Sequence, residues 1–157
     1  MPKQEPILFE DISDEIKAKC DSGVYCPHCG KWAKKYRRAF NSEMSRFLIR
    51  LYNAQQRYNK NYTTRELYPT DNKANTSGVD ARHWELIDVA EAHNIGGAPT
   101  GSFSLTNAGR QFVMGLKYIH SHAVTYNGEL LGLTGDLVNI YDTLGTKFNY
   151  DNLMAGR

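Results

Sequence analysis

A switch in hydrophobic spacing near Leu86 constrains the fold of this chain more than any other feature. Before it, apolar residues recur as they do on one face of a helix. After it, short apolar runs alternate with loops that carry glycine and proline. A chain with helices first and a strand, loop, strand unit afterwards is typical of an α+β fold.

Helices are expected at four places in the first half. The N-terminal one ends at Gly23, and Asn41-Ser42 offers an N-cap for a second that runs to about Arg57. Thr63 and Glu66 have capping-box spacing and open a short helix, and "VDARHWELI" is interpreted as another. Three of these helices have an apolar face. It is Leu8, Ile12, Ile16 and Cys20 in the N-terminal helix; Met44, Phe47, Leu48, Leu51 and Tyr52 in the second; and Val79, His83 and Leu86 in the last.

Strands enter in the second half. "LIDVA" and "GSFSL" flank the loop "EAHNIGGAPT", and Thr106 caps a helix over "TNAGRQFVMGL". "KYIHSHAVTYNGELLGLTG" alternates on both sides of Asn127-Gly128, a dipeptide that suits a two-residue hairpin turn. A helix over "DLVNIYDTLG" ends before Gly145, and "NYDNLMAG" adds one more turn. We expect a shared core of Phe47, Leu48, Leu51, Val79, Leu86, Phe103, Leu105 and Phe112.

The turn "CPHCG" places Cys26 and Cys29 three positions apart. Such a turn directs two thiolates to one centre while backbone amides support them, which favours a structural zinc ion. A redox C-x-x-C would normally open a helix after a strand, and no such unit is visible. An unmetallated turn is the other alternative, since only one cysteine pair is present.

Zinc needs two further ligands. One option adds Cys20 and a histidine, although Cys20 also continues the apolar face of the N-terminal helix. The other takes His122 and His120, because these positions point to one face of a strand. That face is equally well explained as a half-buried strand surface. The expected ligand set is Cys20, Cys26, Cys29 and His122, with His120 as the alternative histidine.

Positive charge is concentrated in one part of the chain. Residues 31–65 hold ten lysines and arginines and one acid, Glu43, for a net charge of +9, whereas the remainder is net −7. Such an asymmetry can steer an anionic partner. A solvated helix face whose arginines pair with acids elsewhere would leave the same pattern.

Length and composition are those of an ordinary globular protein. The 157 residues are 41% hydrophobic and 23% charged, enough to bury one core. No apolar run approaches the ~20 residues that span a bilayer, and the acidic N-terminus does not resemble a signal peptide. We therefore expect a cytoplasmic protein with no membrane partner. The sequence has no phosphate-cradling loop, serine elbow or HExxH motif, so neither an enzyme nor a small-molecule substrate is indicated.

"ARHWELIDV" and "GSFSLTNAGRQFV" resemble the third helix, wing and following helix of bacterial and phage winged helix-turn-helix proteins. Those commonly read "WGLI" and then "LTxxGRxF", and here Glu85 stands where glycine is usual. With its leading knuckle and trailing hairpin, the chain is similar to small zinc-knuckle proteins of bacteriophages. The resemblance implies an N-terminal helix and zinc knuckle at 1–39, a winged-helix domain at 40–116, and a β-hairpin plus helix at 117–157 packed on the same core.

The expected function is DNA binding by a phage accessory or regulatory factor. In a winged helix the third helix can lie in the major groove, but here it offers only Arg82 for a bidentate base contact. Most of the affinity is therefore expected from phosphate contacts. The alternative is a module that docks on a host enzyme, such as RNA polymerase or a defence nuclease. The contacts with nucleic acid are expected at Lys31, Lys34, Lys35, Arg37, Arg38, Arg46, Arg50, Asn75, Thr76, Ser77 and Arg82.

Overall fold

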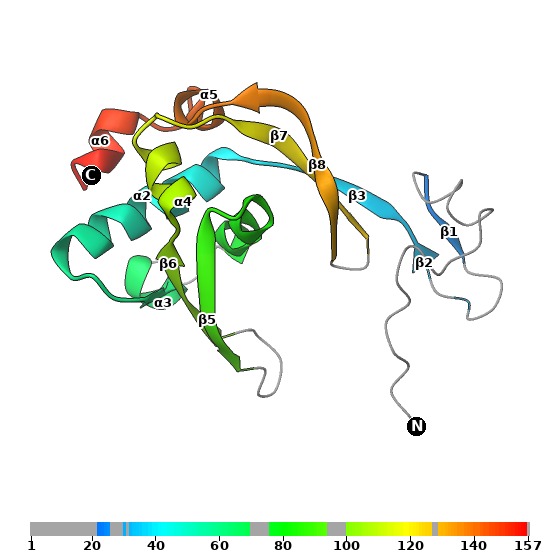
Figure 1. The fold of residues 1–157 in the computed structure, drawn as a ribbon, viewed down its shortest axis with the longest axis horizontal. Helices are drawn as coiled ribbons and strands as arrows, with labels where there is room; N and C mark the ends of the chain where they lie inside the picture. Colours follow the sequence, from blue (N-terminus) through cyan, green and yellow to red (C-terminus); the bar gives the residue numbers. More distant parts are fainter. Residues whose placement is uncertain are drawn as a thin grey trace. The chain divides into compact units, whose positions relative to one another are not determined.

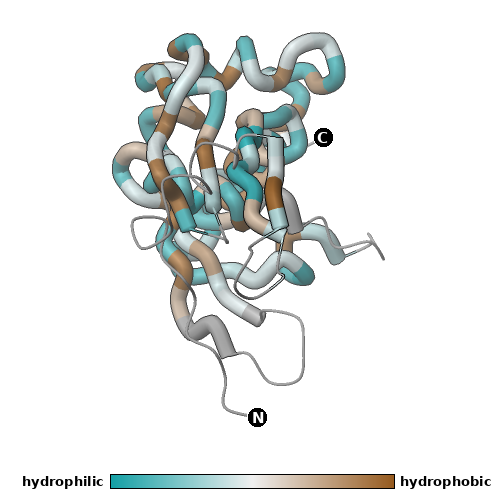
Figure 2. The backbone as a smooth tube through the Cα atoms, turned by 90° about the vertical axis from the view of Figure 1, so that its right-hand side faces the viewer, coloured by the Kyte–Doolittle hydropathy of each residue, from teal (hydrophilic) through white to brown (hydrophobic). Residues whose placement is uncertain are grey.

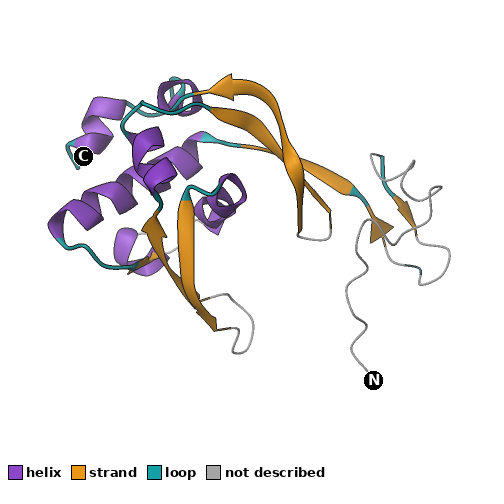
Figure 3. Ribbon diagram, in the orientation of Figure 1, coloured by secondary structure: helices purple, strands orange, loops and turns teal. Residues whose placement is uncertain are grey.

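The computed structural model describes residues 22–25, 30, 32–69, 76–93, 100–126 and 129–156. It divides into two compact units. The N-terminal unit comprises Met1–Ala39 with His122–Thr134, and the helical unit comprises Phe40–Ser121 with Gly135–Arg157. Helices and small antiparallel sheets are both present, as Figure 3 shows. The expected α+β class is confirmed.

The long helix α2, Ser42–Arg57, carries the largest share of the core in the helical unit. It begins where expected, because the side chain of Asn41 accepts a hydrogen bond of 2.9 Å from the backbone N–H of Met44. Its inward face is almost fully buried and includes Met44, Phe47, Leu48, Ile49 and Leu51. The apolar stripe in the sequence therefore predicts both the helix and the side that packs.

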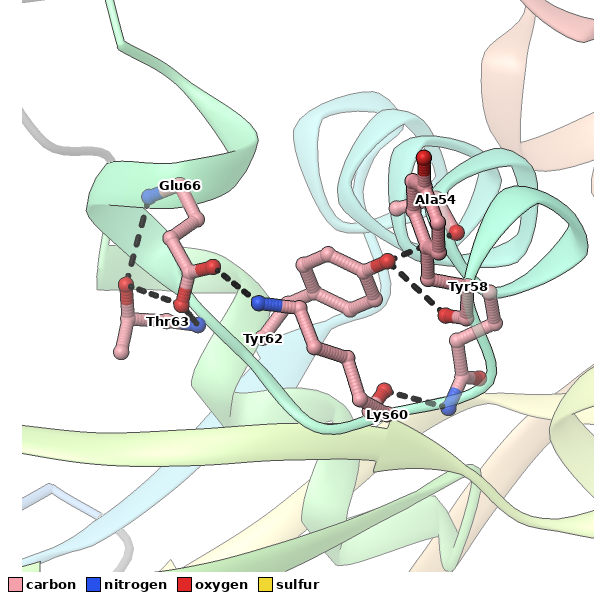
Figure 4. A network of polar contacts seen from close by, with 7 residues as sticks. Ala54, Tyr58, Lys60, Tyr62, Thr63 and Glu66 are labelled. Atoms are coloured by element: carbon pink, nitrogen blue, oxygen red, sulfur yellow. Dashed lines mark hydrogen bonds and ion pairs between the residues drawn. The ribbon is translucent and has the colours of Figure 1, made fainter.

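A short strand and a single helical turn follow α2. β4 is Tyr62–Thr63 and α3 is Thr64–Leu67. Thr63 and Glu66 form the expected capping box, and Lys60 Nζ lies 2.9 Å from Glu66 Oε2 (Figure 4). The hydrogen bond from Lys60 and that from the Thr63 backbone lower the pKa of Glu66. The Tyr62 hydroxyl ties this connection to the end of α2 by donating to the carbonyl of Ala54 at 2.9 Å.

The segment after the undescribed residues 70–75 is a 3-10 helix, η2, at Thr76–Trp84. Of the expected inward face, Leu86 is buried, but Val79 and His83 do not form the buried row of this element. A 3-10 helix has three residues per turn, so side chains at i and i+3 share one side. The buried row is Gly78, Ala81 and Trp84, while Val79 and His83 are half-buried. A Cβ on Gly78 would collide with the Phe47 ring, so the absence of a side chain lets η2 approach α2.

The end of η2 is a tight reversal at Glu85. The N–H of Glu85 donates to the carbonyl of Arg82 at 3.0 Å, and that of Leu86 donates to the carbonyl of Ala81 at 3.4 Å. This pair of bonds is the Schellman arrangement, in which the residue after the helix adopts a left-handed backbone. Glu85 has φ +59°, the one non-glycine residue with positive φ among those described. The position favours glycine, and glutamate is strained there.

Both strands of the expected strand, loop, strand unit are present, and residues 94–99 between them lie outside the described residues. β5, Ile87–His93, pairs antiparallel with β6, Thr100–Leu105 (Figure 1). β6 also pairs with β4, which gives the strand order β4-β6-β5. α4, Asn107–Val113, begins at its expected cap, where the Thr106 hydroxyl accepts from Gly109 N–H at 3.0 Å and donates to the Glu85 carbonyl at 2.7 Å. A Cβ on Gly109 would strike the carbonyl of Leu86, so glycine permits this close packing.

Strands also form where none was expected, in the segment that precedes α2. β1, Val24–Tyr25, pairs with β2, Trp32–Ala33, and β3, Lys35–Ala39, pairs antiparallel with β7, Ile119–Tyr126. β7 also pairs with β8, Glu129–Val138, so both expected hairpin strands are present. Most of the basic run that follows the knuckle, for which no strand was expected, therefore lies in a sheet strand.

Two short helices close the chain. α5 is Ile140–Leu144, with Gly145 beyond its end as expected, and α6 is Tyr150–Met154. The expected helix over "DLVNIYDTLG" is wrong at its start, because Asp136–Val138 belong to β8 and Asn139 is the N-cap. Among the described residues, no helix has the length and apolar character needed to cross a membrane.

The expected core is confirmed at every position but one. Phe47, Leu48, Leu51, Leu86, Phe103, Leu105 and Phe112 are buried, and Val79 is half-buried. Phe47 meets Phe103 edge to face at 5.7 Å between ring centroids. Hydrophobic and hydrophilic segments alternate along the chain in Figure 2, as expected for elements with one buried face.

Candidate nucleic-acid interface

The described part of the N-terminal unit presents a cationic strand, β3. Lys35 is half-buried, and Tyr36, Arg37 and Arg38 are exposed. Alternate residues of a strand lie on the same face, which places Tyr36 with Arg38. In register with these two, the β7 residues Thr125 and Ala123 are buried. The strand is thus anchored through β7 while its own side chains stay accessible.

Tyr36 is the centre of a small cation–π cluster. The ammonium of Lys34 lies 5.5 Å from the centroid of the Tyr36 ring, and the guanidinium carbon of Arg38 lies 5.9 Å from it. Both distances are within the range in which a cation is attracted to a ring face. The chain carries no acid between Trp32 and Ala39. This segment therefore combines an exposed aromatic ring with four lysines and arginines and no acid in the sequence.

A second aromatic group lies on the β1–β2 pair of the same unit. Trp32 and Tyr25 are partners in the register and meet edge to face at 4.9 Å between ring centroids. Gly23, with φ +93°, lies directly against the Trp32 indole, where any Cβ would collide with the ring. Trp32 is therefore held from two sides although 49% of it remains exposed.

The arginines of α2 are engaged within the helical unit. Arg50 donates to the carbonyl of Leu67 at 2.9 Å, and its guanidinium lies 4.4 Å from the centroid of the Tyr68 ring. Arg46 lies 5.2 Å from the same ring and 3.4 Å from the carboxylate of Glu43. Arg46 and Arg50 are half-buried, whereas Arg37 and Arg38 are exposed, so β3 is the more accessible basic element.

Glu43 has a second cation beside it. Lys147 Nζ lies 2.8 Å from Glu43 Oε1. Partial burial opposes ionisation, but the hydrogen bond and charge of Lys147, together with the charge of Arg46, outweigh it and lower the pKa of Glu43. Glu43, the single acid of residues 31–65, therefore has two cations beside it within the fold.

The 3-10 helix η2 offers little for base recognition. Arg82 is exposed, as expected for a base contact. His83 Nε2 lies 4.0 Å from Asp80 Oδ1, so an acid accompanies the other basic group of this turn. The backbone of Thr76 and Ser77 belongs to η2, and nothing further is described for their side chains. Lys31 and Asn75 lie outside the described residues.

The structure describes the two histidines of the expected zinc site but not its three cysteines. Cys20, Cys26 and Cys29 lie outside the described residues. His120 and His122 occupy alternate positions of β7; His120 Nδ1 is 3.1 Å from the carbonyl oxygen of Gly135, and His122 pairs with Ala39 in the register. Within the described ranges, no three His, Cys, Asp or Glu side chains converge as a metal site would require. Zinc binding stays a prediction that depends on the cysteines.

The aromatic residues of this unit were not expected to be functional. The period of two that an extended chain requires is not visible here, because lysine and arginine occupy both alternating sets of positions, Lys34 and Arg38 in one and Lys35 and Arg37 in the other. The high density of lysine and arginine conceals that period, since strands are usually identified by apolar alternation.

Comparison with known proteins identifies no relative: no family model, no curated protein and no solved structure matches this chain.

Proposed function

We propose that this chain is a nucleic-acid-binding protein that contacts phosphates through β3. The observation that carries the proposal is the sheet-anchored strand β3, on which Arg37 and Arg38 are exposed, within a segment that has no acid between Trp32 and Ala39. Lysine and arginine side chains that neutralise phosphates release condensed counterions, which is the main source of affinity for nucleic acid in general.

We further propose that the helical unit is a winged helix-turn-helix. Its elements run helix, short strand, helix, helix, strand, loop, strand, helix, and the sheet order β4-β6-β5 supports that assignment. Two positions of the resemblance have a physical reason here. Glu85 has the left-handed backbone that the family's glycine would adopt, and Gly109 permits α4 to pack on Leu86.

The small number of basic side chains on η2 favours contacts with the phosphates of nucleic acid over recognition of its bases. η2 carries one exposed arginine, Arg82, together with the acid Asp80. Phosphate contacts position a protein on nucleic acid without specifying sequence. We therefore propose an accessory or regulatory factor of low sequence specificity, with a structural zinc ion at the cysteine knuckle. A phage origin belongs to this proposal through the resemblance alone.

A matched pair of double variants tests the role of β3. Arg37→Gln/Arg38→Gln removes two exposed charges from β3, and Arg57→Gln/Arg65→Gln removes two exposed charges from the helical unit. Fluorescence anisotropy at low salt, with labelled duplex DNA, single-stranded DNA and RNA, measures the affinities. We expect the first variant to weaken binding at least about tenfold and the second to change it much less. Absence of binding by the wild-type protein to all three nucleic acids, or equal losses in both variants, would overturn the proposal.

A protein-docking role is the second candidate, and the strand β8 favours it. Leu130, Leu131 and Leu133 of β8 are exposed, and β8 occupies one end of the strand order β3-β7-β8. An exposed apolar strand at the end of a sheet is a template for pairing with another chain. Binding to purified host RNA polymerase by the wild-type protein, and its loss in Leu131→Lys/Leu133→Lys, would support this function. Equal binding by both proteins would exclude β8 as the contact.

A further inference from the structure

Three exposed aromatic side chains accompany the basic strand in the N-terminal unit. Tyr25, Trp32 and Tyr36 are 68%, 49% and 45% exposed. Large aromatic side chains are normally buried for most of their area, because burying them contributes strongly to folding. Exposed tyrosines also occur in the helical unit, at Tyr58, Tyr118 and Tyr141, but the rings of the N-terminal unit lie next to the run of cations at Lys34–Arg38, which suggests a shared ligand.

Two of these rings are held in place before any ligand arrives. The Trp32 indole lies against Gly23 and meets the Tyr25 ring edge to face. The Tyr36 ring lies close to the cations of Lys34 and Arg38, which come two positions before it and two positions after it. Preorganised side chains lose less conformational entropy when they bind, so such rings are suited to a ligand with flat faces.

A nucleic-acid strand with unpaired bases is the ligand that can contact both the aromatic rings and the cations. In a duplex the faces of the bases are covered by their neighbours, and a protein reaches only the base edges and the phosphates. In a single strand the faces are free to stack on aromatic side chains while the phosphates meet lysine and arginine. We infer that the N-terminal unit binds single-stranded nucleic acid, with bases stacked on Trp32 and Tyr36 and phosphates at Lys34, Arg37 and Arg38.

The spacing of Trp32 and Tyr36 allows one short segment of nucleic acid to contact both rings. Tyr36 comes four positions after Trp32, so their Cα atoms lie at most about 14 Å apart. A segment of a few nucleotides can therefore contact both. The charge also favours nucleic acid over an apolar partner, because pairs of cations precede and follow Tyr36 and no acid lies between Trp32 and Ala39. This inference rests on the proposed function and narrows it to a class of nucleic acid.

Intrinsic fluorescence provides a direct reading of the contact. The chain has two tryptophans, Trp32 and Trp84. Trp84 is 5% exposed, and its indole N–H donates to the carbonyl of His120 at 2.7 Å. Because Trp84 is buried, an oligonucleotide that stacks on the protein should quench the fluorescence of Trp32 and not that of Trp84. We expect thymidine and uridine oligomers of about 12 nucleotides to quench the fluorescence of the wild-type protein and of Trp84→Phe, but not that of Trp32→Phe.

Affinities of aromatic variants test the same contact without relying on fluorescence from tryptophan. Trp32→Ala and Tyr36→Ala should each weaken single-strand binding about 5- to 100-fold, because each removes one stacking platform. Trp32→Phe and Tyr36→Phe should keep most of the affinity, since a ring remains. Tyr58→Ala, which removes an exposed tyrosine of the helical unit, should leave it unchanged. Circular dichroism confirms that each variant is folded.

The outcomes separate this inference from the proposed function. If the wild-type protein binds neither duplex nor single strands at low salt, the proposed function fails. If it binds duplex DNA at least as tightly as single strands, or if folded Trp32→Ala and Tyr36→Ala bind single strands as the wild type does, the inference fails while the proposed function stands. Preference for the thymidine or the uridine oligomer distinguishes DNA from RNA as the ligand.

Discussion

At the scale of single residues, one backbone angle sets the geometry between η2 and β5. Glu85 adopts a left-handed conformation so that the chain can reverse, and its neighbours Ala81 and Leu86 are fully buried on either side of the turn. A non-glycine residue in this conformation is less stable by roughly 1–2 kcal/mol. Packing of the surrounding residues must offset that strain.

Replacing the strained glutamate should relieve the backbone. Glu85→Gly should raise the free energy of unfolding by up to about 1 kcal/mol, because relief of backbone strain exceeds the added entropy of the unfolded chain. Urea denaturation measures the change. Glu85→Ala is the control, since it removes the same side chain but keeps the strained backbone, and its stability should stay close to that of the wild type. A loss of stability in the glycine variant would show that Glu85 is not strained.

The ion pairs of Glu43 produce a pH dependence with a defined sign. Because the pKa of Glu43 is lowered by folding, its contribution to stability is present above the ordinary carboxyl value of 4.5 and is lost as the pH falls through the lowered pKa. Glu43→Gln should therefore reduce stability at neutral pH by about 0.5–1 kcal/mol, and the difference from the wild type should shrink in acid. Urea denaturation at neutral and acidic pH, with Glu129→Gln as the control, measures it. A difference that grows on acidification would refute the assignment.

At the scale of elements, the sequence predicts those that begin with a cap and carry an apolar face. α2 starts at Asn41, α3 at the Thr63 capping box and α4 at Thr106, because these side chains satisfy local backbone donors. β3 was not predicted, since its strand character comes from pairing with β7, more than eighty positions further along the chain. The inward row of η2 was missed because a three-residue period depends on the contact of Gly78 with Phe47.

The approach of η2 to α2 makes Gly78 a sensitive position. Gly78→Ala should lower the free energy of unfolding by about 1–3 kcal/mol, because its Cβ would overlap the Phe47 ring. Gly132→Ala in β8 is the matched control, since a Cβ there meets no atom of the described structure within 4 Å. Thermal unfolding of both variants provides the comparison. Equal stability of Gly78→Ala and the wild type would show that η2 does not pack on α2 in this way.

At the scale of the whole molecule, we propose different roles for the two units: the N-terminal unit contacts nucleic acid, and the helical unit contains most of the hydrophobic core. The helical unit holds the long helix and the buried aromatic core, and the N-terminal unit holds the exposed rings and the accessible cations of β3. The sequence predicts the concentration of positive charge and most of the core. It does not separate half-buried arginines of α2, such as Arg50, from the exposed arginines of β3, because that difference depends on tertiary contacts.

Zinc binding is a prediction of the sequence for the N-terminal unit. The purified protein should contain about one zinc ion per chain, and Cys26→Ser or Cys29→Ser should release it and lower stability, because metal binding energy contributes to folding energy. Elemental analysis and thermal unfolding with and without a chelator measure both effects. A metal-free protein whose thiols all react in the native state would exclude the zinc knuckle.

The central claim is that β3 supplies the phosphate contacts, and the salt dependence of binding tests it most directly. For duplex DNA, the slope of log K against log salt concentration should fall in magnitude by about 0.9 for each phosphate that the protein no longer neutralises. Changing Lys34, Lys35, Arg37 and Arg38 together to glutamine should therefore reduce the slope by about 3 to 4 and weaken binding to all sequences alike. A slope identical to that of the wild type would contradict the claim and place the phosphate contacts elsewhere on the protein.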